Sequence, residues 1–346
     1  MLRFASCRQI NPPVRPSVAV LFCYTIQMSS LFGKKKLEEK TVAIVDIENS
    51  SVAAALVQLS QEEPKLFAEK RTFLSIPQRL HGENLLHTTI AAAQELLLHV
   101  SEVAARMRMH RKLALMGDVQ QAVVFFGPPW AEIDTTSSGS VQVNAPRVLT
   151  QELRSQIGSV FGDVETSFHS FATAAARIAQ RSVPDEPYLL CTITGEITEL
   201  TLAQEGRILA RATLPVGLYT LLRTLTTHGG LSQAEAYSAL KLQFSYLKEP
   251  FDSVGEHFSN ALYHGLEDMV ASLPTRNVFV LAHEPNGEWF AQAIVSDPKV
   301  ATLFKDGGVV RALRPAHLSP LLAAHATHPD LFLMLEALFV DVRHGV

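Results

Sequence analysis

Two stretches of the sequence, 41–77 and 188–217, repeat the same pattern of three short apolar runs joined by polar turns. The runs are rich in β-branched residues, and turn-forming residues bound them, which is typical of neighbouring antiparallel strands. The first run, 41–45, is continuously apolar, as a central strand buried on both faces must be. Because segments of helical periodicity follow each stretch, the repeat predicts a duplicated α/β fold with two lobes around a cleft.

Composition and charge exclude several classes of function. Hydrophobic residues make up 47% of the 346 residues, as in an ordinary globular chain. A formal net charge of −4 argues against a nucleic-acid partner held by bulk electrostatics. The 3 cysteines lie far apart and no HExxH spacing occurs, so we predict no metal site and no disulfide framework. Such cysteine usage favours a reducing, cytoplasmic setting.

The segments between and around the two strand-rich stretches set the expected domain boundaries. Helical periodicity covers 84–109, and a buried strand, 121–130, ends in Gly-Pro-Pro. The apolar segment 329–343 predicts a buried helix. The expected organisation is an N-terminal extension (1–38), a first core subdomain (39–80 and 158–185), an inserted αββα-type subdomain (81–157), a second core subdomain (186–224 and 275–346) and a helical subdomain of the second lobe (225–274).

The first 38 residues differ from the rest of the chain. Only basic residues carry charge before Glu38, and the apolar run 17–26 is too short to span a bilayer as a helix. We expect a flexible extension, with Met28 as an alternative start, so that residues 1–27 need not be translated. A signal peptide or a membrane-tethering segment is the alternative interpretation.

The order of elements resembles the actin-like ATPase superfamily, which has a ribonuclease H-like fold. More narrowly, it resembles the bacterial branch that contains the cell-division protein FtsA and the type IV pilus assembly protein PilM. The segment "AIVDIENSSVAAALV" (43–57) is similar to the family's first phosphate loop, and "CTITGEITELTLAQEGRILARATLPVG" (191–217) is similar to the second loop and its hairpin. The segment "VVFFGPPWAEIDTTSSGSVQVNAPRVLTQELRSQI" (123–157) resembles the domain that this branch carries as an insertion.

The resemblance implies a nucleotide site between the lobes. In this superfamily the two hairpin turns approach the phosphates from opposite sides, and their backbone N–H groups form an anion nest. The residues that the resemblance assigns to such a site are Asp46, Asn49, Ser50, Ser51, Gly195, Glu196, Thr198 and Gly287. Without the resemblance, Asp46 caps a turn, Gly195 is a hairpin glycine and Thr198 is an ordinary strand residue.

The motifs depart from the family pattern where the chemistry needs them. Glu48 stands where the first loop has glycine, Thr192 where the second loop has aspartate, and Thr194 where it has another glycine. Ala282 and His283 replace the usual Gly-Gly after a late strand. Loss of a positioned base or magnesium-shell carboxylate typically costs about 10²–10⁴ in rate. We therefore predict no catalytic residue and no cofactor, with ATP and Mg²⁺ as the alternative.

A scaffold that has lost its catalysis persists by binding a partner. The resemblance implies a PilM-like pseudo-ATPase, cytoplasmic and held at the inner membrane through the cytoplasmic tail of a PilN-like membrane-anchored protein. The expected contact residues are Phe126, Pro128, Pro129 and Trp130, of which Pro128 and Trp130 should be partly exposed. The alternative interpretation of Phe126 and its neighbour Phe125 is that they pack in the core and do not contact a partner. The same resemblance is compatible with self-association, with an FtsA-like division protein, and with an active ATPase or kinase of the superfamily.

Overall fold

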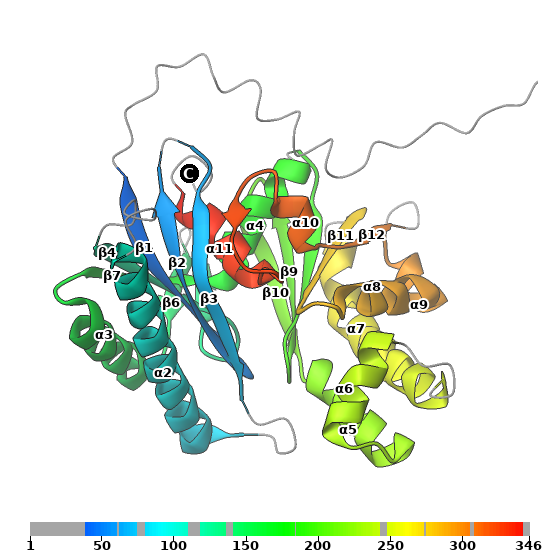
Figure 1. Cartoon of the computed structure of the whole chain (residues 1–346). Helices are drawn as coiled ribbons and strands as arrows, with labels where there is room; N and C mark the ends of the chain where they lie inside the picture. The colour runs from blue at the N-terminus through cyan, green and yellow to red at the C-terminus, as the bar shows by residue number, and fades with distance from the viewer. Residues whose placement is uncertain are drawn as a thin grey trace, which may run out of the picture.

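The computed structural model describes residues 39–341, except 61, 75–79, 110–117, 136–140, 184, 243–247, 273–274 and 305–307. Two twisted sheets form two lobes, and two helices lie between them (Figure 1). The predictions for residues 1–38, including the extension and its start, lie outside the described residues.

The first lobe contains a six-stranded sheet in the order β13-β3-β2-β1-β4-β7. Its strands are β1 (Lys40–Ile47), β2 (Ser51–Leu59), β3 (Lys65–Phe73), β4 (Val119–Phe126), β7 (Glu165–Ser170) and β13 (Ala323–Ala324). β1 pairs antiparallel with β2 and parallel with β4, so it is central, as its continuous apolar run predicted. Val42 and Ile44 face one hydrophobic core, while Ala43 and Val45 face another on the opposite side of the sheet.

Helices cover both faces of this sheet. They are α2 (Gly82–Met109), α3 (Arg147–Phe161), α4 (Phe171–Ala179), which runs into the short 3-10 turn η2 (Gln180–Ser182), and α11 (Leu331–Val340). α2 packs on β2 and β3, and α3 packs on α2. α4 and α11 pack against each other on the other face, where Phe171 stacks on Phe332 with ring centroids 4.8 Å apart. α11 is the buried helix that the sequence predicted, and the Asp330 side chain caps its first turn by accepting from the backbone N–H of Phe332 and Leu333.

Two elements of the segment expected as an inserted subdomain, 81–157, pack with the first lobe. α2 covers the first lobe's own sheet, and β4 lies within that sheet between β1 and β7. The apolar run of β4 is buried on both faces, because Val123 and Phe125 enter one core while Val124 and Phe126 enter the other. Only β5 (Glu132–Thr135) and β6 (Val141–Asn144) form a separate two-stranded sheet, next to α3 in the sequence.

The second lobe repeats the plan of the first with a five-stranded sheet in the order β10-β9-β8-β11-β12. Its strands are β8 (Tyr188–Ile193), β9 (Thr198–Gln204), β10 (Arg207–Leu214), β11 (Asn277–Ala282) and β12 (Val309–Ala312). β8 and β9 form the predicted antiparallel hairpin, and β11 pairs parallel with β8, as β4 does with β1. The two predicted strand triplets are therefore the equivalent hairpin units of the two lobes.

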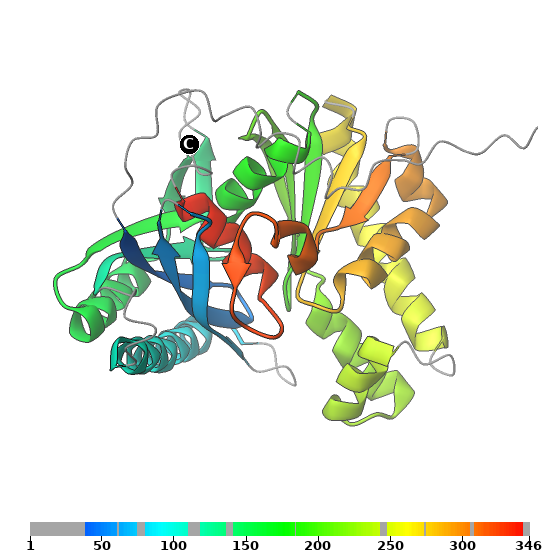
Figure 2. The same cartoon turned by 45° about the horizontal axis from the view of Figure 1, so that its top comes forward.

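The other helices in the described part of the chain include five in the second lobe: α5 (Leu218–Gly229), α6 (Gln233–Leu242), α7 (Lys248–Ser272), α8 (Gly287–Ser296) and α9 (Pro298–Thr302). The single-turn α10 (Pro315–Leu318) packs against α11, and its Leu318 lies in the core that both lobes share. α5 and α6 project from one end of the second lobe (Figures 1 and 2). A capping box precedes α6, because Ser232 N–H donates to Glu235 Oε2 at 2.8 Å and Glu235 N–H donates to Ser232 Oγ at 3.3 Å.

The lobes share one hydrophobic core. Ile44 of β1, Phe171 of α4, Leu190 of β8 and Phe279 of β11 belong to the same cluster of buried side chains, together with most of α11. Figure 2 shows α4 and α11 between the two sheets. The lobes are therefore held together by a packed interior as well as by the loops that join them.

Candidate functional site

The turn after β1 and the turn after β8 meet between the lobes. Gly195 N–H donates to Ser50 Oγ at 2.7 Å, and the Tyr219 hydroxyl donates to the carbonyl oxygen of Ser50 at 3.0 Å. The Thr194 hydroxyl lies 3.2 Å from Asn49 Oδ1, to which it donates. These contacts bring Asn49 and Ser50 of the first lobe directly against Thr194 and Gly195 of the second.

Two glycines permit this close approach. A Cβ on Gly195 would lie 2.3 Å from Ser50 Cβ and 2.9 Å from Tyr219 Cε2. A Cβ on Gly217 would lie 2.6 Å from the carbonyl oxygens of both Thr194 and Gly195. Gly195 therefore lets one turn of the protein contact the other, which is a different use from the phosphate contact that the resemblance assigns to it.

Adding a methyl group at Gly195 should push the two turns apart. We expect Gly195→Ala to lower the free energy of unfolding by about 1–3 kcal/mol, the usual cost of forcing extra volume into a packed interior. Gly158→Ala is the control, because nothing lies within 4 Å of a Cβ at that helical position. It should instead stabilise by about 0.5–1 kcal/mol. Urea unfolding measures both variants, and equal effects would contradict the close approach at Gly195.

Glu48 occupies the centre of the contact between the lobes. Its carboxylate accepts from the Ser51 hydroxyl at 2.6 Å and lies 3.0 Å from His283 Nε2 and 3.5 Å from Arg71 Nη1. Its backbone carbonyl accepts from Trp130 Nε1–H at 2.9 Å. Burial alone would raise the pKa of Glu48, but the neighbouring His283 and Arg71 lower that pKa below its ordinary value. Glu48 is thus held as a carboxylate.

Arg71 of β3 brings a positive charge close to three carboxylates, those of Asp46, Glu48 and Asp330. Its guanidinium donates to Asp330 Oδ2 at 2.6 Å, to Asp46 Oδ2 at 2.7 Å and to Ser51 Oγ at 2.8 Å. Burial raises the pKa of Asp330, but Arg71 outweighs that effect and holds the pKa at about 2. At Asp46 burial prevails over Arg71 and raises the pKa to about 7.

Glu336 of α11 lies beside this ionic cluster. Its side chain is fully buried, and neither carboxyl oxygen has a hydrogen-bond partner among the residues the structure describes. Burial, followed by the nearby Asp46, raises the pKa of Glu336 well above its ordinary value. Its neutral form is therefore the one that the fold favours.

The structure gathers only part of the residue set assigned to a nucleotide site. Asp46, Asn49, Ser50 and Ser51 lie together, with Gly195 against Ser50. The remaining residues have partners within the second lobe. Thr198 donates its hydroxyl to the Val216 carbonyl at 2.7 Å, Glu196 pairs with Arg223 at 2.6 and 2.7 Å, and Gly287 begins α8 with Ala312 Cβ 3.4 Å from where its own Cβ would be.

Sequence reasoning missed several of the residues that make the site. Arg71, Asp330 and Glu336 come from β3 and from the N-terminus and interior of α11. One feature of the sequence could have pointed to Glu336, because it is the single charged residue in the otherwise apolar segment 331–340. His283 was noted as a departure from the family pattern, but its contact with Glu48 was not predicted. No group of three or more histidine, cysteine or acidic side chains in the described part of the chain could hold a metal ion.

The expected exposure of the partner-binding residues is wrong. Phe126 and Pro128 are buried, and Trp130 is only 6% exposed, which leaves Pro129 as the exposed member of the set. The reason is that the Gly-Pro-Pro turn folds back over the first lobe. Trp130 N–H donates to the Gly127 carbonyl at 3.0 Å, and its indole donates to Glu48 as described above.

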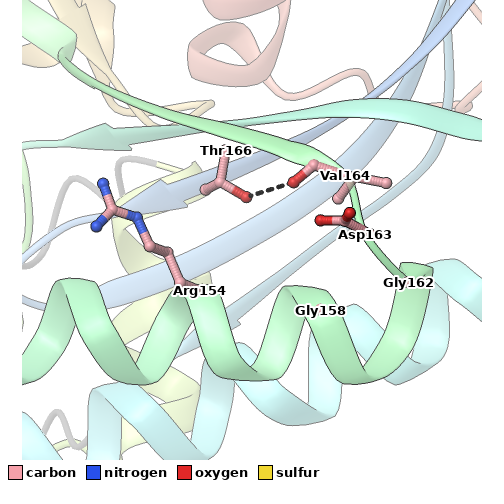
Figure 3. Close-up of a pocket in the computed structure, with 6 residues that line it drawn as sticks. All are labelled: Arg154, Gly158, Gly162, Asp163, Val164 and Thr166. Atoms are coloured by element: carbon pink, nitrogen blue, oxygen red, sulfur yellow. Dashed lines mark hydrogen bonds between the residues drawn. The ribbon is translucent and has the colours of Figure 1, made fainter.

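A surface hollow lies elsewhere, between α3 and β7 (Figure 3). It has a volume of about 450 Å³ and is lined by Arg154, Gly158, Gly162, Asp163, Val164 and Thr166. We call it the α3–β7 hollow. β7 is the last strand of its sheet and pairs only with β4 among the described strands. The guanidinium of Arg154, on α3, lies 4.7 Å from the centroid of the ring of Phe168, on β7.

Comparisons with known proteins place the fold. No protein-family model matches the sequence, and no curated protein sequence matches it significantly. Among solved structures, a chain of the PilM–PilN type IV pilus biogenesis complex is similar, with a TM-score of 0.57 and 15% identity over 85% of this chain and 94% of that one. The ethanolamine utilization protein EutJ from Carboxydothermus hydrogenoformans is also similar, with a TM-score of 0.50 and 18% identity over 86% and 94% of the two chains.

These similarities define the class of protein by its fold. The chain has the two-lobe α/β fold of the actin-like ATPase superfamily, as the sequence predicted. PilM is among the structural neighbours, and at these identities the likeness concerns the fold alone. In the described residues, no helix combines the length and the apolar character that crossing a membrane requires.

Proposed function

We propose that this chain is a PilM-like scaffold of a type IV pilus or a related membrane-associated assembly machine, and that it works without ATP. It would be cytoplasmic and held at the inner membrane through the tail of a membrane-anchored partner. PilM in the solved complex is bound to PilN, which suggests a PilN-like protein as that partner.

The observation that carries the proposal is the direct contact between the two turns. Ser50 and Gly195 are hydrogen-bonded at 2.7 Å, in the place where the superfamily would hold phosphates between its loops. Glu48 adds a buried carboxylate beside them, and a phosphate brought close to it would meet a like charge in a region of low dielectric. Both features favour a scaffold over a nucleotide-driven enzyme.

The α3–β7 hollow is the part of the first lobe best suited to hold an extended tail. A peptide can add to a free sheet edge by backbone hydrogen bonds, with adjacent pockets taking its side chains. β7 is the last hydrogen-bonded strand of its sheet, with β6 packed beside part of it, and Gly158 and Gly162 leave room close to the backbone of α3. The lining also offers one cation, Arg154, and one anion, Asp163, to fix the direction of a bound chain.

Two substitutions at Gly158 test whether the α3–β7 hollow binds the tail. The probe is a fluorescent peptide with the sequence of a PilN cytoplasmic tail, and anisotropy measures its binding. Gly158→Arg fills the hollow, and we expect it to weaken binding by about tenfold or more. Gly158→Ala leaves the hollow open and should bind as the unchanged protein does. Equal affinity of the arginine variant, or no binding of the peptide to the unchanged chain, would count against the proposal.

The absence of ATP use has its own test. We expect millimolar Mg-ATP to leave the melting temperature unchanged within about 1 °C, since a ligand that binds the native state must raise apparent stability. Magnesium tripolyphosphate is the control for non-specific ionic effects. A rise with Mg-ATP that tripolyphosphate does not reproduce would favour an active ATPase or kinase of the superfamily instead.

A further inference from the structure

One side chain links the two lobes through a charged contact. Glu48 follows β1 in the first lobe, and His283 follows β11 in the second. Glu48 Oε2 and His283 Nε2 are 3.0 Å apart, and the exposed fractions of the two side chains are 2% and 7%. Hydrogen bonds that involve an ionised group are roughly twice as strong as neutral ones, and burial strengthens them further.

Both partners of this contact are held in place by their own surroundings. Glu48 N–H donates to the Ser51 carbonyl at 2.9 Å, and the Ser51 hydroxyl donates to the same carboxylate oxygen that faces His283. The His283 ring stacks on Phe332 at 4.4 Å and meets the edge of Phe73 at 5.5 Å. Neither side chain can turn away without losing these contacts.

The neutral contacts between the turns start from the same short segment. Asn49 and Ser50 provide the acceptors for Thr194, Gly195 and Tyr219 of the second lobe. The position of these acceptors depends on the conformation of the turn, which Glu48 and Ser51 close by hydrogen bonds to each other. Loss of the Glu48 carboxylate would therefore weaken the neutral contacts as well as the charged one.

We propose that Glu48 is a built-in latch, whose carboxylate binds His283 and keeps the two lobes closed without any bound ligand. The Glu48 side chain lies between the lobes and makes the contact with His283 that a bound ligand would otherwise have to supply. This role is independent of which partner the protein binds, so it stands or falls separately from the scaffold function.

Hydrogen–deuterium exchange measured by mass spectrometry tests the latch from both sides. We expect Glu48→Ala and His283→Leu each to speed exchange in peptides covering 194–197 by about tenfold, while peptides covering the central strand β1 stay protected. The double variant should exchange no faster than the faster single variant, because both changes remove one interaction. Circular dichroism confirms that each variant is folded.

The matched control is Asn277→Leu, at the opposite end of β11 from His283. Asn277 is also buried and donates to a carboxylate, Glu186 Oε2, at 2.7 Å. It should leave exchange of 194–197 unchanged. The proposal fails if His283→Leu also leaves that exchange unchanged, or if β1 and 194–197 speed up together, which would mean a general loss of stability. If Glu48→Ala does not fold, Glu48→Gln replaces it with the same expected result.

Discussion

Replacement of Arg71 by leucine is expected to lower the free energy of unfolding by about 3–5 kcal/mol, the cost of removing one partner from a buried ion pair. The side chain of Arg71 is 6% exposed, and its guanidinium contacts Asp46, Glu48 and Asp330. Without it, buried carboxylates would face one another with no cation between them. This is one of the two largest effects that we expect from a single substitution in the chain.

Urea unfolding at pH 7 measures this effect, with Arg314→Leu as the control. Arg314 pairs with Glu288 at the surface, where the two side chains are 49% and 52% exposed. Such exposed pairs contribute about 0–1 kcal/mol. If the two arginine variants lose similar stability, the ionic cluster around Arg71 does not hold the first lobe together in the way described.

Replacement of Glu336 by methionine is expected to have the opposite sign and to raise the free energy of unfolding at pH 7.5 by about 1–3 kcal/mol. Glu336 is a buried carboxyl group without a hydrogen-bond partner among the described residues, and methionine has a similar length with no group to desolvate. Glu102→Met is the control, because the Glu102 side chain is 65% exposed on α2. That change should alter stability by less than about 0.5 kcal/mol.

The effect of Glu336→Met should also depend on pH. The pKa of Glu336 is raised in the folded state, so above the ordinary value of 4.5 the unfolded chain releases a proton that the native state keeps. Stability therefore falls as pH rises from that value toward the folded pKa. Asp46 and Glu69, whose pKa values are both raised to about 7, act in the same direction.

Asp330 changes stability with pH in the opposite direction. Its pKa is lowered to about 2, so it contributes stability that is lost as pH falls from about 4 toward 2. Unfolding measured at pH 5 and 7.5 should show the unchanged protein losing stability toward pH 7.5, with a smaller loss in Glu336→Met. Parallel pH profiles of the two proteins would contradict the raised pKa of Glu336.

Local patterns in the sequence predicted much of the fold. The two strand triplets and the buried helix predicted over 329–343 each depend on residues close together in the chain. The strand next to β4 was not predicted from the sequence. The apolar run of β4 indicated a buried strand, but periodicity does not say which strand will be the neighbour. β4 pairs with β1, which is far from it in the sequence, and this long-range pairing places β4 in the sheet of the first lobe.

The candidate site was less predictable than the fold. The resemblance to the superfamily assigned Ser50 and Gly195 to two equivalent turns, and the structure places these two residues in direct contact. Arg71 and Asp330 come from elements widely separated in the chain, and a charged residue in a sequence is normally a surface residue. Trp130 was expected to be partly exposed as a partner-contact residue, but its indole N–H donates to the buried carbonyl oxygen of Glu48.

The position of α11 in the chain has a consequence for synthesis on the ribosome. This helix lies near the C-terminal end of the described residues, yet it packs against β1 near their beginning and joins the core that both sheets share. The growing chain must therefore keep part of one apolar face of its first sheet uncovered until residues 331–340 have been made. Nascent chains in that condition are prone to aggregate, so we expect a general chaperone to bind this protein before α11 emerges from the ribosome.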